Sequence, residues 1–143
     1  MKLIINTDGL SKNNPGQAAI GAVLRDARGK TVATVSRAIG IATNNEAEYR
    51  AVIAALEKAL ALGAEQVELH SDSELVVNQL KGRYKVRSTG LRPFYLQAAK
   101  LLGQFQRVSI ICVPREQNAE ADRLANEAVR KNSSLRDSGI SPM

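Results

Sequence analysis

The chain has 143 residues, 44% of them hydrophobic, which is enough for one globular domain that folds without disulfides or structural metals. Its 20 lysines and arginines and 14 acidic residues give a formal net charge of +6, and no residue from Leu75 to Arg115 is acidic. Such a basic stretch indicates a polyanionic partner such as nucleic acid, although a solvated basic face kept for solubility explains the charge alone equally well.

A single cysteine and a single histidine limit the metal and redox chemistry. Cys112 cannot form an intramolecular disulfide, and its apolar run, 108–113, predicts a small buried side chain in a reducing compartment. One cysteine and one histidine do not supply the usual zinc ligands. No run approaches the roughly 18 apolar residues of a membrane span, and the N-terminus lacks a signal-peptide pattern. We therefore expect a cytoplasmic protein without a membrane span.

The first part of the chain is predicted to form an antiparallel meander. Three β-rich runs at 2–8, 18–25 and 31–39 are separated by turn residues, and the segment 26–29 is typical of a hairpin. Short turns between sequential strands favour antiparallel pairing, because a parallel connection needs a longer crossover.

The rest of the chain alternates helices with strands. Apolar spacing predicts a helix over 45–62 closed by Gly63, followed by a strand, two helices, a strand and a helix at 67–71, 73–80, 91–105, 107–113 and 119–131. The polar remainder, 132–143, is expected to be a disordered tail, so that one domain covers 1–131. This order predicts an α/β fold with a five-stranded mixed sheet flanked by helices, in which strands one to three are antiparallel and strands four and five are parallel.

Two acidic residues come at the ends of predicted strands that should be neighbours. Asp8 ends the first strand, and Asp72 ends the fourth. If those strands are parallel, both carboxylates lie at the edge of the sheet where α/β proteins usually bind ligands.

A third carboxylate, Glu48, lies on the face of the first predicted helix that must contact the sheet. A structural role explains it as well, because Asn45 and Glu48 have the spacing of a capping box. Ser71 or Asp72 could likewise cap the short helix that follows them.

The fourth carboxylate, Asp122, lies in the last predicted helix. Alone it would be interpreted as a solvated helix residue. If it meets the other three, the carboxylates cannot all remain ionised without cations, since like charges raise one another's pKa. Oxygen ligands suit Mg²⁺ or Mn²⁺, and two such ions about 4 Å apart are the arrangement used in phosphoryl transfer.

Short motifs containing these acids follow one another along the chain. They are Thr7-Asp8-Gly9 followed by Asn14-Pro15-Gly16, then Thr43-Asn44-Asn45 with Glu48, then Ser71-Asp72-Ser73, then Asn118 with Asp122, Leu124 and Ala125. Each is weak alone, but together they resemble the type 1 ribonuclease H family over 1–131. The resemblance implies the ribonuclease H-like fold, in agreement with the predicted order of elements.

The resemblance also implies an activity: endonucleolytic cleavage of the RNA strand of RNA/DNA hybrids, leaving 5′-phosphate and 3′-hydroxyl ends. Asp8 would bridge two Mg²⁺ ions, for which Mn²⁺ can substitute. Asp122 would help to hold the ion that activates the water, and Glu48 and Asp72 the ion on the leaving-group side. No protein nucleophile is then required.

The family's substrate contacts imply binding residues as well. They are Asn44 and Asn45 in the minor groove of the hybrid, Asn14 and Thr43 at the DNA-strand backbone, and Gly9 and Ser11 near RNA 2′-hydroxyls. Contacts to 2′-hydroxyls let a protein select RNA without reading its sequence. The asparagines can also cap the helix, and both roles can hold together.

Three features depart from the family pattern. The loop at 114–117 lacks the histidine of many members, and Glu74 stands where many relatives have glutamine. The tryptophan-rich basic handle is replaced by a short basic segment, 81–92. We expect this basic segment to contact the DNA strand through Lys81, Arg83, Lys85 and Arg87.

Two alternatives remain open. The same fold could also cleave double-stranded RNA, because 2′-hydroxyl contacts argue against a DNase but not against an RNA duplex. The chain could instead be a hybrid-binding module that has lost catalysis, although all four carboxylates are present. Matching over nearly the full length favours a monomeric domain.

Overall fold

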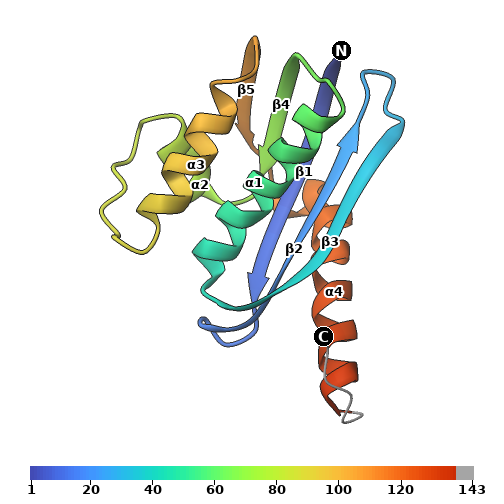
Figure 1. Ribbon diagram of the computed structural model, residues 1–143, viewed down its shortest axis with the longest axis vertical. Coiled ribbons are helices and arrows are strands. Elements are labelled where there is room, and N and C mark those ends of the chain that lie inside the picture. The colour runs from blue at the N-terminus through green and yellow to red at the C-terminus, as the bar shows by residue number, and fades with distance from the viewer. Residues whose placement is uncertain (138–143) are drawn as a thin grey trace.

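The computed structural model describes residues 1–137, whose strands are β1 (Lys2–Ser11), β2 (Gly16–Arg25), β3 (Thr31–Ala42), β4 (Gln66–Ser71) and β5 (Arg107–Cys112). They form one sheet in the order β3-β2-β1-β4-β5 (Figure 1). β1, β2 and β3 pair antiparallel, whereas β4 pairs parallel with β1 and β5 parallel with β4. The predicted five-stranded mixed sheet is therefore confirmed, with β1 at its centre.

The helices cover both faces of the sheet and are α1 (Asn44–Ala61), α2 (Glu74–Leu80), α3 (Arg92–Leu102), the 3-10 helix η1 (Arg115–Asn118) and α4 (Ala119–Asp137). α1 packs on β1 and β2, and α3 packs beside α1. α4 packs on β2, β3 and β1 from the opposite face (Figure 1). None of the helices in residues 1–137 is long and apolar enough to cross a bilayer.

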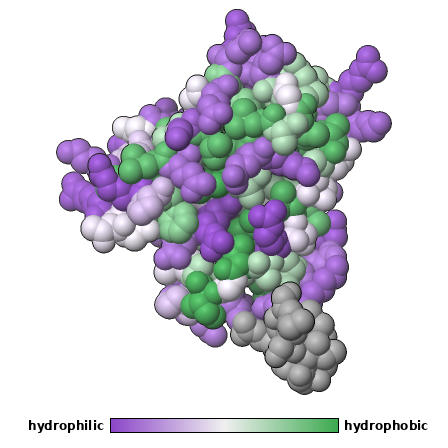
Figure 2. Space-filling model, in the orientation of Figure 1, coloured by the Kyte–Doolittle hydropathy of each residue, from purple (hydrophilic) through white to green (hydrophobic). Residues whose placement is uncertain are grey.

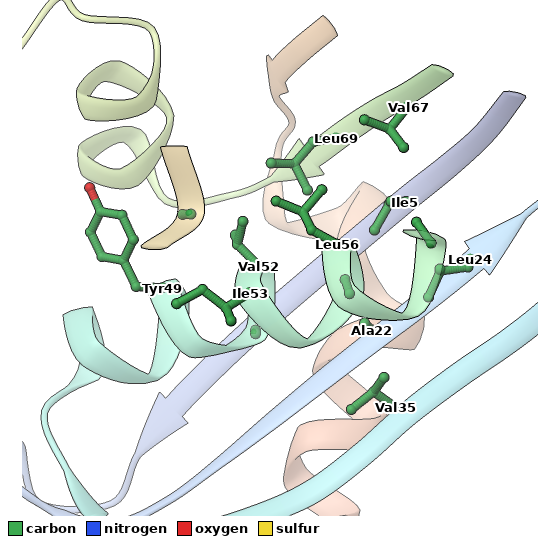
Figure 3. Packing of buried hydrophobic residues seen from close by; sticks show 14 of the residues in the cluster. Ile5, Ala22, Leu24, Val35, Tyr49, Val52, Ile53, Leu56, Val67 and Leu69 are labelled. Atoms are coloured by element: carbon green, nitrogen blue, oxygen red, sulfur yellow. The ribbon is translucent and has the colours of Figure 1, made fainter. Parts of the chain in front are cut away.

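The main core lies between α1 and the sheet. In β1 and β4, alternate residues such as Ile5 and Leu69 point toward α1, which is the period expected of strands with one buried face. Val52 and Leu56 of α1 meet them in Figure 3, and both are fully buried. Burying one such side chain contributes about 1.5–3 kcal/mol, so this face of α1 fixes the helix against β1.

Three sequence-based expectations are wrong in detail. The last helix continues to Asp137, so 132–137 is helical rather than a disordered tail, and the rest of that tail, 138–143, lies outside the described residues. Asn and Ser cost an established helix only about 0.5 kcal/mol each, too little to end it at 131. Cys112 is exposed, because β5 is an edge strand with little covering it. The first helix, predicted over 45–62, spans Asn44–Ala61, and Leu62 is its C-cap.

Candidate active site

Three carboxylates meet at one edge of the sheet, where β1 and β4 run side by side. Thr7 pairs with Ser71 in the parallel ladder, so the next residues, Asp8 and Asp72, are neighbours. Glu48 reaches the same point from α1, and one oxygen from each of the three carboxylates lies within 4.8 Å of the other two. The predicted convergence of these three residues is confirmed, although β1 does not end at Asp8 as expected but continues to Ser11, paired with β2.

Glu48 is aimed at β1 and does not cap its own helix. The N-cap of α1 is Thr43, whose hydroxyl accepts a hydrogen bond of 3.1 Å from the Glu46 amide. The alternative that Asn45 and Glu48 form a capping box is therefore wrong. The Glu48 carboxylate instead accepts a hydrogen bond from the backbone amide of Gly9, which ties α1 to the strand that carries Asp8.

Asp72 does not cap α2 either. Ser73 is the N-cap of α2, and its hydroxyl accepts a hydrogen bond of 3.2 Å from the Val76 amide. The hydroxyl of Ser71 accepts from the Ser73 amide at 3.1 Å and holds the turn. The alternative that Ser71 or Asp72 caps this helix is therefore wrong, and the Asp72 carboxylate is available to the groove.

Two glycines allow the helices to come close enough for the acids to meet. A Cβ on Gly9 would lie 2.2 Å from the carbonyl carbon of Ala47, so α1 could not rest on β1 there. A Cβ on Gly21 of β2 would lie 2.2 Å from the carbonyl oxygen of Ala121 in α4. The helix backbones thus occupy the space that side chains would fill.

Asp122 lies beside Asp8 but outside the closest cluster. Its side chain shares a hydrogen bond with the Asp8 carboxyl and lines the same groove. Among the described residues, the group of carboxylates within 4.8 Å of one another consists of Asp8, Glu48 and Asp72. The structure therefore brings all four predicted acids to one groove and packs three of them tightly.

The pKa values of the clustered acids are raised by burial and by mutual repulsion. Burial, a hydrogen bond with Asp122 and the charge of Asp72 raise the pKa of Asp8 to about 8, while Arg115 opposes the rise. Burial, followed by the charge of Asp8, raises the pKa of Glu48 well above its ordinary value. Burial also raises the pKa of Asp72. Ionising all of these acids is therefore unfavourable without a cation.

The donor set fits a hard divalent cation. In the described part of the chain, no lysine or arginine forms an ion pair with Asp8, Glu48, Asp72 or Asp122. The available ligands are carboxylate oxygens, which Mg²⁺ and Mn²⁺ prefer. Arg115 offsets part of the negative charge without forming an ion pair, so the cluster would still favour such an ion.

The carboxylates lie in a groove of about 990 Å³. Four of the predicted substrate residues line it: Gly9, Ser11, Asn44 and Asn45. Asn14 and Thr43 do not line it. Asn14 nevertheless supports those that do, because its side-chain oxygen accepts from the Asn44 amide at 2.9 Å, while the Asn44 oxygen accepts from the Ser11 amide at 2.7 Å. These bonds join the β1–β2 turn to the start of α1.

The basic segment lies apart from this groove. Lys81, Arg83, Lys85 and Arg87 are all exposed on the connection between α2 and α3, and none of them lines the groove. Figure 2 shows hydrophilic side chains gathered at the side of the molecule where Figure 1 places that connection. The segment is accessible to a large ligand that extends beyond the carboxylates.

Known proteins are similar to this chain in sequence and in fold. A model of the family described as reverse transcriptase-like matches residues 6–128. Bifunctional protein Rv2228c of Mycobacterium tuberculosis is 49% identical over 130 residues, which cover 90% of this chain and 36% of that protein. RNase H1 of Halobacterium salinarum superposes with a TM-score of 0.90 and 45% identity, over 92% of this chain and 99% of that one. The chain belongs to the ribonuclease H family.

A further ribonuclease H structure contains nucleic acid. LC11-RNase H1 in complex with an RNA/DNA hybrid has a TM-score of 0.86 and 41% identity to this chain, and the match covers 90% of this chain and 97% of that one. The chain thus corresponds to whole solved ribonuclease H domains, although it spans only 36% of the length of its mycobacterial relatives.

The sequence interpretation gave no role in the groove to several residues that line it, among them Lys12, Cys112 and Arg115. Lys12 and Arg115 are the lysine and arginine among the described lining residues, and Cys112 lines the groove beside them. Arg115 belongs to the acid-free stretch, but charge counting gave no reason to separate it from the other basic residues. Its place in η1, directly before α4 and Asp122, became visible only in the structure.

Proposed function

We propose that the protein is a metal-dependent endonuclease that hydrolyses the RNA strand of RNA/DNA hybrids and leaves 5′-phosphate and 3′-hydroxyl ends. The observation that carries this proposal is the meeting of Asp8, Glu48 and Asp72 within 4.8 Å, with Asp122 alongside. The complex of LC11-RNase H1 with a hybrid supports the choice of substrate.

In this proposal, the four carboxylates hold two Mg²⁺ ions, or Mn²⁺ in their place. Divalent ions supply an acidified water and offset negative charge on the departing oxygen. Asp8 would be a ligand for both ions, Asp122 would help to hold the ion that activates the water, and Glu48 and Asp72 would help to hold the other. The four carboxylates hold and orient the ions, and no serine or cysteine has to form a covalent intermediate.

The raised pKa values make proton binding and cation binding compete. Asp8, with a pKa of about 8, is largely protonated at neutral pH in the absence of a cation. It must lose that proton to act as a ligand, because a protonated carboxyl is a poor ligand for a hard cation. Divalent-cation affinity is therefore expected to rise as pH rises toward this value.

Substrate selection is assigned to the groove wall formed by the β1–β2 turn and the start of α1. Gly9, Ser11, Asn44 and Asn45 line this wall, and Asn14 and Thr43 support it. Backbone amides and side-chain amides there suit 2′-hydroxyls and base edges in a wide minor groove. The basic segment, 81–92, would hold the DNA strand farther along the duplex.

A cleavage assay on three labelled duplexes tests the proposal. An RNA/DNA hybrid, an RNA duplex and a DNA duplex are each incubated with Mg²⁺, Mn²⁺ or EDTA. The wild type should cut the RNA strand of the hybrid with either metal and not with EDTA, and Asp8→Asn should lose the activity. Absence of hybrid cleavage with both metals would overturn the proposal. Cleavage of the RNA duplex as well would widen the substrate class.

The oligomeric state is proposed to be monomeric. Light scattering of the purified protein with and without a hybrid would test this, and a dimer mass in the absence of nucleic acid would contradict it.

A further inference from the structure

One buried amide, that of Asn118, occupies the junction between η1 and α4. Its side chain is 1% exposed. The Asn118 Nδ2 donates a hydrogen bond of 2.8 Å to the carbonyl oxygen of Thr7, the residue directly before Asp8. The Asn118 Oδ1 accepts a hydrogen bond of 3.1 Å from the Asn6 side chain. Both ends of the amide are thus held by β1.

The same amide also contacts a carboxylate of the cluster. The Asn118 amide lowers the pKa of the Asp72 carboxyl, just beyond β4, against the larger effect of burial. An asparagine amide has two donor hydrogens and one acceptor oxygen. Thr7 takes one donor hydrogen and Asn6 uses the acceptor oxygen, which leaves the second donor hydrogen for Asp72. A flipped amide would place its oxygen against the Thr7 carbonyl and the Asp72 carboxylate, which fixes the orientation.

These contacts join three of the segments that carry the acids. Thr7 precedes Asp8 in β1, Asp72 follows β4, and Asp122 lies one turn after Asn118 in the same continuous helical segment. Glu48 is held separately by the Gly9 amide. Asn118 itself is not a candidate ligand, because its oxygen faces Asn6 rather than the carboxylates.

We propose that Asn118 is a positioning residue that sets the spacing of Asp8, Asp72 and Asp122, so that divalent-cation binding by the protein depends on this amide. The proposal rests on the metal-dependent function assigned above. Removing a residue that orients metal ligands typically lowers metal affinity or activity by about 10- to 100-fold.

Calorimetric titration of the nucleic-acid-free protein with Mg²⁺ tests the proposal without any cleavage. Asn118→Ala removes the amide, and Asn118→Leu removes it while keeping a similar volume. Ser36→Ala is the matched control, because the Ser36 hydroxyl donates a 2.7 Å hydrogen bond to the Leu124 carbonyl and so ties α4 to β3 away from the acids. All variants are first checked for folding by circular dichroism.

The Asn118 variants should bind Mg²⁺ at least about tenfold more weakly than wild type, while Ser36→Ala should stay within about twofold. On a hybrid, kcat should fall while KM changes little, since the amide does not line the groove. Unchanged Mg²⁺ affinity in the Asn118 variants would overturn the proposal. An equal loss in Ser36→Ala would also overturn it, because the effect would then follow the anchoring of α4.

An NMR titration of the wild type covers the case in which the Asn118 variants do not fold. The side-chain amide resonances of Asn118 should shift at the same Mg²⁺ concentration as the backbone amides around Asp8 and Asp72. Resonances of Asn118 that stay in place while those of Asp8 move would contradict the proposal. If Mg²⁺ moves these resonances but no hybrid is cut, the proposed function fails and the positioning role stands.

Discussion

Gly21 lies directly opposite Asp8 in the antiparallel ladder of β1 and β2, and a Cβ at Gly21 would lie 2.2 Å from the Ala121 carbonyl oxygen. The missing side chain lets the first turn of α4 rest on the sheet next to the central carboxylate. Asp122, the residue after Ala121, therefore reaches Asp8. The arrangement of the acids in this chain depends on a backbone contact as well as on the acids themselves.

Gly21→Ala should push α4 away from β2 and separate Asp122 from Asp8. Overpacking of this kind costs about 1–3 kcal/mol in the free energy of unfolding, measured by urea denaturation. Hybrid cleavage should fall by more than the unfolded fraction explains. Gly90→Ala is the control, because the nearest atom to its Cβ is 3.7 Å away. A Gly21→Ala protein with wild-type stability and activity would show that α4 does not need this approach.

Asp8→Asn should change how stability depends on pH in EDTA. The folded-state pKa of Asp8, about 8, is above the ordinary value of 3.8, so the folded protein binds this proton more tightly than the unfolded chain. The resulting stabilisation is complete below about pH 4 and is lost as pH rises to about 8. The wild-type melting temperature should therefore fall across this range.

In Asp8→Asn the melting temperature should fall less as pH rises. Part of the fall should remain, because the pKa values of Glu48 and Asp72 are also raised. Since about 1 kcal/mol corresponds to about 4 °C for a domain of this size, the variant should melt several degrees above wild type near pH 8. Mg²⁺ should reduce this difference. A melting difference that is the same at both ends of the pH range would contradict the buried, protonated state of Asp8.

Replacing Lys81, Arg83, Lys85 and Arg87 together by alanine should weaken hybrid binding and its salt dependence. Each phosphate contact contributes about 0.9 to the slope of log affinity against log salt concentration on B-form DNA, so the slope should fall by about 2–4. Binding is measured in Ca²⁺ or with Asp8→Asn to prevent cleavage. Arg28→Ala with Lys30→Ala, on the β2–β3 hairpin, is the control. An unchanged slope would rule out phosphate contacts by the basic segment.

Cys112 should be a modifiable residue at the groove, in contrast to the buried thiol expected from sequence. Partial desolvation and the charges of Glu74 and Asp72 raise the pKa of its thiol, so alkylation by N-ethylmaleimide should be slow at neutral pH and faster as pH rises. The adduct should block hybrid cleavage, because Cys112 lines the groove. Cys112→Ser should remain active and resistant. Full activity after complete alkylation would place the substrate elsewhere.

The sequence by itself determined the order of the elements, the mixed sheet and the meeting of Asp8 with Asp72. Apolar periodicity is local information, and parallel strands must bring their carboxyl ends to one edge, so these conclusions needed no coordinates. The motif order also identified Glu48 and Asp122 as their partners.

Only the tertiary structure decided which of several suitable residues performs each role. Thr43, Asn44 and Asn45 all suit a helix cap, and in the structure Thr43 is the N-cap while the Asn44 side chain binds the Ser11 amide. Cys112 is exposed because burial of an edge strand depends on what packs over it. The Asn118 amide joins Thr7, Asn6 and Asp72, which are far from it in the chain, and no local pattern encodes contacts made across that distance.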